Sequence, residues 1–304
     1  MQKHHHQHSH SHAPPSAAPM RALVAALTIT STVFFAELVG GWLTGSVALM
    51  ADAMHMLSDA AGLIIAVVAI AIGRRAFTRQ ATYGYRRVEV LAALVNAVTV
   101  LVVSVWIVIE AIHRLSSPVE ILAGPMMIIA VIGLVANAAS AWVLHSQREH
   151  SVNMEGAFLH VLSDMLGSVA VLIAGAVIMI TGWTYADVIA SLIIAALVLP
   201  RAWQLLKHCL SVLLEQVPPS FDAREVEPVL RSLDGVTELH DLHLWSLNGT
   251  DVLASVHLVV PETHEATSVM CRAQEALRSI NISHSTIQIE RPGHVKHEAA
   301  ENVC

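Results

Sequence analysis

The feature that most constrains this chain is a series of long apolar blocks between residues 21 and 207. A bilayer core is crossed by about 20 apolar residues of helix, and in lipid only helices and closed barrels satisfy their backbone hydrogen bonds. The blocks are long and do not alternate strictly between apolar and polar residues, so they indicate helices. The sequence predicts six transmembrane helices: Leu23–Leu43, Val47–Ile72, Val88–Ile112, Ile121–Leu144, Val152–Ile180 and Tyr185–Leu206.

The composition agrees with a membrane protein and argues against other classes. Hydrophobic residues make up 55% of the 304 residues and charged residues 13%, whereas soluble proteins carry about 25% charged residues. The formal net charge of -7 offers no basic face for nucleic acid, so we expect no nucleic-acid partner. The three cysteines are scattered without a CxxC motif, so we expect no disulfide framework and a reducing environment for the soluble parts.

The basic residues predict how the spans are oriented. The link between the second and third blocks contains five arginines, whereas the link between the third and fourth contains only Arg114. Links rich in Lys and Arg stay in the cytoplasm, so we place residues 73–87 there. With six spans, both termini are then cytoplasmic, and we expect a multi-pass protein of the inner (plasma) membrane.

The two ends of the chain, residues 1–20 and 295–304, are predicted to be disordered. The first is a His-rich and then Pro/Ala/Ser-rich tail that is too polar to fold alone and lacks the apolar core of a signal peptide. Two interpretations stay open: weak metal capture, or a cloning tag or solvated tail. The histidines concerned are His4, His5, His6, His8, His10 and His12.

After the membrane domain, assigned to residues 21–210, the composition changes and a cytoplasmic domain is predicted over residues 211–294. Pro218-Pro219 marks the boundary, and Asn248-Gly249 is a strong hairpin signal. Helical and alternating patterns give the order αββαβ, an α+β domain of ferredoxin-like type. The expected elements are Asp222–Leu233, Val236–Leu247, Val252–Val260, Glu265–Ile280 and Ser285–Glu290.

Two of the predicted spans carry the same pair of ionisable residues. The second span contains His55 and Asp59, and the fifth contains His160 and Asp164. An ionisable group in the middle of a span costs roughly 2.5–3.5 kcal/mol, and residues i and i+4 share a helix face. If the two faces meet, they surround one point with two imidazoles and two carboxylates, a four-ligand nitrogen and oxygen set that suits Zn²⁺. Neither span offers a cysteine for copper(I).

The polar residues of the predicted spans also permit other interpretations. A single HxxxD pair is compatible with a hydrogen bond inside one helix or a polar contact between helices, but two copies in the same order favour a shared metal site. Asp52 lies on roughly the same face as His55, and we expect it to orient the His55 ring rather than to be a ligand or proton carrier. Glu37, Asn96 and Asn137 are expected to form hydrogen bonds between helices rather than to be ligands.

This combination resembles the cation diffusion facilitators, a family of divalent-metal/proton antiporters, and in particular its bacterial zinc/cobalt/cadmium-resistance and zinc-efflux branch. The resemblance extends over about residues 20–292 and includes the runs Tyr83–Glu89 and His240–Trp245 beside the spans and their HxxxD motifs. It implies a homodimer whose ferredoxin-like domains meet below the membrane. The transport site that it implies consists of His55, Asp59, His160 and Asp164.

The resemblance also implies metal sites outside the spans. Many relatives bind zinc in the cytoplasmic domain, and His240 and His257 match that pattern. The third-strand position that is His in some members is Ile289 here, so Glu290 is the third candidate ligand. Some relatives carry another zinc site between the second and third spans, but residues 73–87 contain no His and no Asp, so we expect that site to be absent.

The sequence therefore predicts a secondary transporter, not an enzyme, that exports Zn²⁺, with Cd²⁺ or Co²⁺ as further substrates, in exchange for H⁺ by alternating access. Two alternatives stay open: a membrane-anchored metal sensor or receptor, and a metal-dependent intramembrane enzyme. A sensor's anchor would avoid the cost of ionisable residues in its spans. An enzyme would need an open ligand position for water, and the chain has neither HExxH nor GxSxG.

Overall fold

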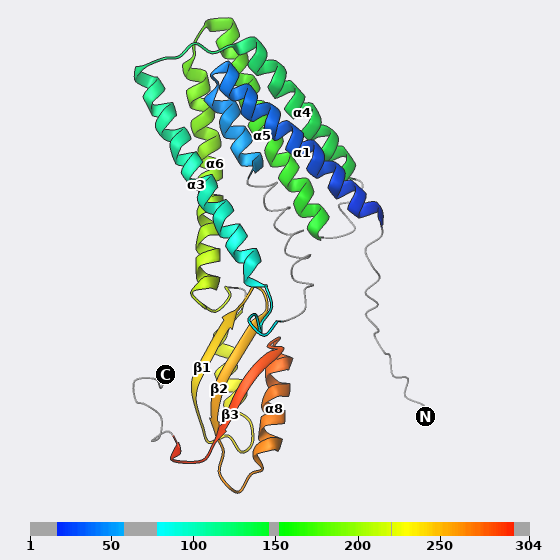
Figure 1. The fold of residues 1–304 in the computed structure, drawn as a ribbon, viewed down its shortest axis with the longest axis vertical. Helices are drawn as coiled ribbons and strands as arrows, with labels where there is room; N and C mark the ends of the chain where they lie inside the picture. The colour runs from blue at the N-terminus through cyan, green and yellow to red at the C-terminus, as the bar shows by residue number, and fades with distance from the viewer. Residues whose placement is uncertain (1–16, 58–77, 146–151, 220, 295–304) are drawn as a thin grey trace. The chain divides into compact units, whose positions relative to one another are not determined.

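The computed structural model describes residues 17–57, 78–145, 152–219 and 221–294. The chain divides into two compact units, Met1–Leu63 with Val100–Pro200, and Ile64–Thr99 with Arg201–Cys304. The described part of the first unit is helical, and the second contains a small sheet with its own helices (Figure 1).

The first unit is a bundle in which α4 packs along both α1 and α5 (Figure 1). Val33 and Phe34 of α1 pack against Ala53 and Met56, which lie on a short helix after α1. Its elements are α1 (Ala17–Thr44), the helix Val47–Leu57, the second half of α3 (Arg87–Ser116), α4 (Ala123–His145), α5 (Val152–Thr181) and the first half of α6 (Tyr185–Leu213).

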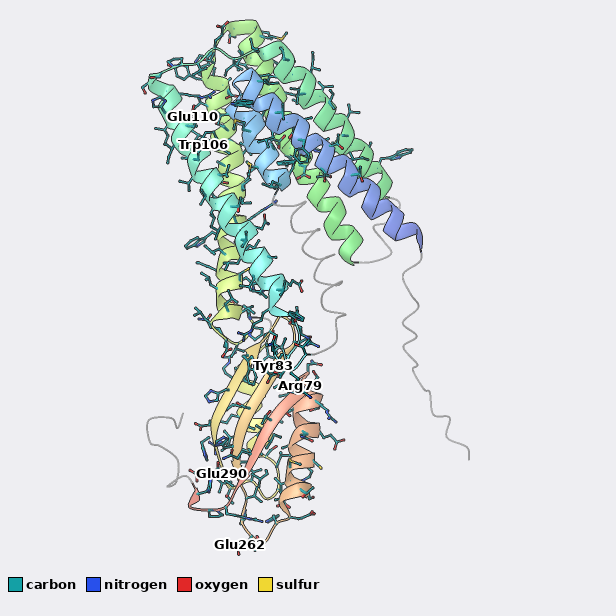
Figure 2. The ribbon with its side chains drawn as sticks, viewed as in Figure 1. Arg79, Tyr83, Trp106, Glu110, Glu262 and Glu290 are labelled. Atoms are coloured by element: carbon teal, nitrogen blue, oxygen red, sulfur yellow. The ribbon has the colours of Figure 1, made fainter. Side chains whose placement is uncertain are left out.

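The prediction of membrane-crossing helices is confirmed. Four described helices are long and apolar enough to cross a membrane: α3, α6, Ala123–Trp142 of α4 and Asp164–Thr181 of α5. The first predicted span forms α1, and the second begins as Val47–Leu57, but residues 58–72 of that block lie outside the described residues. Six spans therefore stay a prediction. Large apolar side chains such as Trp106 on α3 remain exposed (Figure 2), as expected of helices that face lipid.

The soluble part of the second unit follows the predicted order of helices and strands. Its three-stranded sheet has the order β1-β2-β3, with β1 and β2 antiparallel and β2 and β3 parallel. The parallel pair is joined through α8, which packs against β3. The ferredoxin-like classification stays a prediction. The elements are a 3₁₀ turn (Ala223–Glu225), α7 (Val226–Arg231), β1 (Glu238–Ser246), β2 (Val252–Val259), α8 (Ala266–Ser279) and β3 (His284–Glu290).

Local chemistry explains where these elements begin and end. The Asn248 side chain accepts hydrogen bonds from the backbone N–H groups of Thr250 and Asp251 at 3.1 Å, and Gly249 adopts a φ of 88°. A left-handed backbone of this kind favours glycine, so the predicted hairpin is confirmed. The expected single helix Asp222–Leu233 is wrong, because its first turn is a separate 3₁₀ turn that the Asp222 side chain caps.

The core of the second unit lies between the sheet and its helices. Val256 and Leu258 of β2, Leu230 of α7 and Leu277 of α8 are fully buried together. The residues that alternate with this apolar set on the strands face the other side of the sheet, because successive strand residues point to opposite faces. That second face holds the polar cluster described below.

Candidate metal sites

The first candidate site joins a histidine and an aspartate from two helices of the first unit. His55, on the helix Val47–Leu57, places Nε2 3.4 Å from Oδ1 of Asp164 on α5, and the two side chains are only 8% and 1% exposed. Two donors at adjacent corners of a zinc tetrahedron lie about 3.4 Å apart when the bonds are about 2.1 Å long. The geometry therefore fits an ion pair and also fits two ligands of one metal ion.

Half of the predicted transport site is described. Asp59 lies outside the described residues, and His160 lies on α5 with a side chain that is outside the described part. The histidines of the N-terminal tail also lie outside the described residues, as do residues 73–77 of the link in which no metal site was expected. The four-ligand site consequently stays a prediction, of which the structure describes only the contact between His55 and Asp164.

Asp52 lies between the same two helices. Its Oδ2 accepts a hydrogen bond of 3.1 Å from the Ser168 hydroxyl on α5, and its carboxylate fills the space beside Gly167, where an added Cβ would overlap it. A glycine is needed at this position because the carboxylate approaches the α5 backbone closely. Asp52 thus connects the helix Val47–Leu57 to α5, the two helices that carry the candidate ligands. Its expected role in orienting His55 stays a prediction.

The helix Val47–Leu57 begins at a cap supplied by another helix. Asp187, in the first turn of α6 and fully buried, accepts a 2.5 Å hydrogen bond from the Ser46 hydroxyl. It also accepts hydrogen bonds from the backbone N–H groups of Val47 and Ala48 at 2.9 and 3.3 Å. These N–H groups have no partner inside their own helix, and a carboxylate there meets the positive end of the helix dipole. Asp187 therefore fixes the start of the ligand-bearing helix.

Sequence reasoning did not identify Asp187 or Ser168 as functional residues. Ser46 is a preferred N-cap residue, and it precedes the second span directly. That signal predicts a capped helix. It cannot reveal that a carboxylate from α6, that of Asp187, also accepts hydrogen bonds from the first N–H groups of the helix. Such a pairing depends on tertiary structure alone.

The expectation that Glu37, Asn96 and Asn137 form hydrogen bonds between helices stays a prediction, because residues 58–77 and 146–151 lie outside the described residues. Glu37 on α1 and Asn137 on α4 are 0% and 1% exposed, yet none of their side-chain oxygen and nitrogen atoms has a hydrogen-bond partner among those residues. Buried polar atoms rarely stay unsatisfied. The partners of these two side chains therefore do not belong to the described part of the chain.

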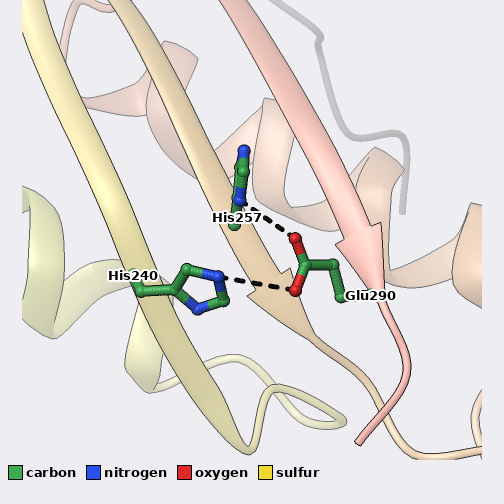
Figure 3. A group of neighbouring side chains, drawn as sticks. All are labelled: His240, His257 and Glu290. Atoms are coloured by element: carbon green, nitrogen blue, oxygen red, sulfur yellow. Dashed lines mark ion pairs between the residues drawn. The ribbon is translucent and has the colours of Figure 1, made fainter. Parts of the chain in front are cut away.

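The second candidate site lies on the polar face of the sheet in the second unit. His240 Nε2 lies 3.4 Å from Glu290 Oε2, and His257 Nδ1 lies 2.9 Å from Glu290 Oε1. Figure 3 shows both imidazoles directed at the two oxygens of this carboxylate. One ligand atom from each residue lies within 4.8 Å of the others, so the structure brings together all three residues proposed for this domain.

Strand register explains how this cluster forms. His240 on β1 pairs directly with His257 on β2, and His257 pairs with Gln288 on β3. Glu290 follows Gln288 by two residues and so shares its face, and Gln288 donates a 2.7 Å hydrogen bond to Glu290 Oε1. The register therefore places Glu290, and not Ile289, on the face of the sheet that carries His240 and His257.

A bulge in β1 brings another carboxylate to the cluster. The pairing register shifts between His240 and His243, and Asp241 there has a φ of 48°. Such a bulge re-aims the side chains around it. Asp241 Oδ2 lies 3.8 Å from His257 Nδ1, a neighbour that strict alternation of the strand would place on the opposite face from His240. With two imidazoles and a buried carboxylate, the donor set suits Zn²⁺.

Two protein-family models together match most of the chain. The model of the cation efflux transmembrane domain matches residues 23–214, and that of the cation efflux protein cytoplasmic domain matches residues 218–292. Zinc transporter ZitB of Yersinia pestis is 42% identical over 275 residues, which cover 89% of this chain and 87% of the relative. Metal cation efflux system protein CzcD of Cupriavidus metallidurans is 42% identical over 272 residues, covering 89% and 86%.

A more distant relative carries a name that includes counter-ions. The cadmium, cobalt and zinc/H(+)-K(+) antiporter of Bacillus subtilis is 36% identical over 277 residues, which cover 90% of this chain and 89% of the relative. The two domain matches together with these relatives account for the apolar helices and for the small sheet that follows them. The chain belongs to the cation efflux family of metal-cation transporters, not enzymes, in its zinc/cobalt/cadmium branch.

Proposed function

We propose that this chain exports Zn²⁺ from the cytoplasm in exchange for H⁺, using His55, Asp59, His160 and Asp164 as the transport site. The observation that carries the proposal is the buried contact between His55 and Asp164, which come from different apolar helices. Zinc is named for the ZitB relative and for the Bacillus subtilis antiporter, and the antiporter's name adds cadmium and cobalt, so Cd²⁺ and Co²⁺ are further candidate substrates.

The donor set explains why metal and protons would exchange. Only the neutral imidazole binds a metal ion, so zinc entering from the cytoplasm displaces protons from the histidines. External protons reload the imidazoles after release, because their ordinary pKa of about 6.5 permits both states near neutral pH. Export of a dication against an inside-negative potential costs about 2.3 kcal/mol per net charge per 100 mV. Inward proton movement offsets that cost during alternating access.

The second site supports a regulatory or structural zinc ion in the cytoplasmic domain. His240, His257 and Glu290 would hold this ion, and their ligand atoms already lie within 4.8 Å of one another. We further propose that the chain acts as a homodimer in the inner membrane, with both termini in the cytoplasm. The match to the cytoplasmic domain of cation efflux proteins supports this arrangement, and the His-rich tail would deliver metal to the cytoplasmic mouth.

The transport proposal is tested by zinc uptake into inside-out membrane vesicles under an imposed proton gradient. Asp59→Ala and Asp164→Ala are expected to reduce uptake to the level of vesicles without the protein. Asp234→Ala is the matched control, because its side chain is 88% exposed on the second unit. Uptake at the parent rate by either site variant would refute the site. Zinc binding without flux in the parent would favour a metal sensor instead.

A further inference from the structure

One buried carboxylate of the first unit has no role in the transport site. Glu37 on α1 is fully buried, and among the described residues neither of its carboxylate oxygens accepts a hydrogen bond. No ion pair involves Glu37 within the described part of the chain. An ionised carboxylate held in this way is so costly in an apolar interior that it takes up a cation or a proton.

The packing of α4 makes room for such a group. An added Cβ at Gly133 would overlap Oε1 of Glu37, so the carboxylate is seated directly on the α4 backbone. Asn137 lies one helical turn further along α4 and on the same face, and its amide oxygen and nitrogen also have no partner among the described residues. The site therefore presents oxygen donors and lacks an imidazole or thiolate of its own, which suits a hard cation better than zinc.

Within the described part of the chain, the charged groups that act on Glu37 are both carboxylates. Asp52 on the helix Val47–Leu57 and Asp164 on α5 both act electrostatically on its carboxylate. Neighbouring carboxylates in a low-dielectric interior cannot all remain ionised. Asp52 receives a hydrogen bond from Ser168 and Asp164 lies beside His55, whereas Glu37 has no such partner among the described residues. Glu37 is therefore the member of this group that most needs a proton.

We propose that Glu37 is a proton-binding site of its own, separate from the metal ligands, that loads when the transport site is empty and unloads when a divalent cation arrives. The coupling would be electrostatic. A dication beside Asp164 cancels the negative charge that faces Glu37. This lowers the free-energy cost of ionising Glu37, so its proton leaves. This inference rests on the proposed zinc/proton exchange and assigns one of the exchanged protons to a residue outside the transport site.

The first test counts the protons released when zinc binds. Purified full-length protein is titrated with zinc in a calorimeter, in two buffers of different ionisation enthalpy. Glu37→Gln is expected to release about one proton fewer per zinc ion than the parent, and Glu37→Asp, which keeps an ionisable group, is expected to restore it. Glu110→Gln on α3 is the matched control, because the Glu110 carboxylate is already paired with Arg114 at 2.9 Å. Equal proton release by Glu37→Gln and the parent would overturn the inference.

A second measurement needs no variant. Dicyclohexylcarbodiimide reacts with protonated carboxyl groups in apolar surroundings, and the modified residue is located by mass spectrometry. Labelling of Glu37 in the parent protein, with a severalfold decrease when zinc is added, is expected. No labelling with or without zinc, or labelling that zinc does not change, would contradict the proposal. If the parent transports zinc normally in either case, the proposed function stands and only the role of Glu37 falls.

Discussion

His55 Nε2 lies 3.4 Å from Asp164 Oδ1, although α3 and α4 separate their helices in the chain. The contact joins an imidazole and a carboxylate in a buried position, where either group alone would be costly. A divalent cation between them would use both groups as ligands and offset their desolvation. The transport proposal thus depends on how firmly the helix Val47–Leu57 and α5 are held together, and several predictions address this.

His55 is predicted to set the choice of metal. Replacing its imidazole by a carboxylate in His55→Asp makes the donor set harder, which favours Mn²⁺ over Zn²⁺. The measurement is uptake of each cation into inside-out vesicles at matched free concentrations. A higher ratio of manganese to zinc uptake is expected. An unchanged metal preference would show that His55 does not select the substrate.

Asp187 is predicted to hold the ligand-bearing helix in place. Asp187→Ala removes the acceptor for three hydrogen bonds at the start of that helix, and loss of an N-cap costs about 0.5–2 kcal/mol. Lower thermal stability in detergent and slower zinc uptake are therefore expected. Ser46→Ala removes the hydroxyl that bonds Asp187 and accepts from the Leu49 N–H at 3.1 Å, but it leaves both backbone hydrogen bonds to the buried Asp187 carboxylate. It should therefore have a smaller effect. An equal or larger effect of Ser46→Ala would contradict this account of the cap.

The close approach between Asp52 and Gly167 predicts a steric effect. A methyl group in Gly167→Ala would overlap the Asp52 carboxylate, break its hydrogen bond to Ser168 and cost about 1–3 kcal/mol of overpacking. Reduced thermal stability and reduced zinc uptake are expected. Gly124→Ala on α4 is the matched control, since nothing lies within 4 Å of the added group. Equal behaviour of the two variants would argue against a tight Asp52 contact.

The cytoplasmic cluster is predicted to bind its zinc ion independently of transport. His257→Ala should remove about one zinc ion per chain in equilibrium dialysis, because two ligands from the cluster cannot replace three. Glu290→Gln should weaken binding at the same site, since it removes the negative charge between the two imidazoles. His243→Ala changes an exposed residue on β1, the strand that carries His240, and this variant should bind zinc as the parent does. Unchanged stoichiometry in His257→Ala would exclude this site.

Much of the fold is predictable from local patterns. The apolar blocks predict the helices because burial in lipid requires a continuous run of apolar residues. In the second unit, alternation places the ends of β2 and β3 within one residue of the observed ends and those of β1 within two. The α-helix expected over Asp222–Leu233 is observed only over Val226–Arg231, after a 3₁₀ turn. Pro228 lacks the N–H that a continuous α-helix would bond to the carbonyl of Arg224.

The candidate sites are predictable only in part. His55 and Asp164 can be identified as candidates because each belongs to an i, i+4 pair, with Asp59 and His160 respectively, and a helix fixes which residues share a face. The roles of Asp187 and Glu37 depend on contacts between helices, which no local pattern encodes. Glu290 could be identified only as a weak candidate, because strand alternation and register decide whether it or Ile289 faces the histidines, and the register is a property of the folded sheet.

The most direct test of the account is a double-mutant cycle between His55 and Asp164. Zinc affinity is measured for His55→Ala, Asp164→Ala and the double variant, all in a His257→Ala background that removes the cytoplasmic site. If both side chains are ligands of one ion, either single substitution should abolish most of the zinc binding. The zinc affinity of the double variant should then be little lower than that of either single variant. Independent losses that multiply in the double variant, or parent-like affinity in either single variant, would contradict a shared transport site.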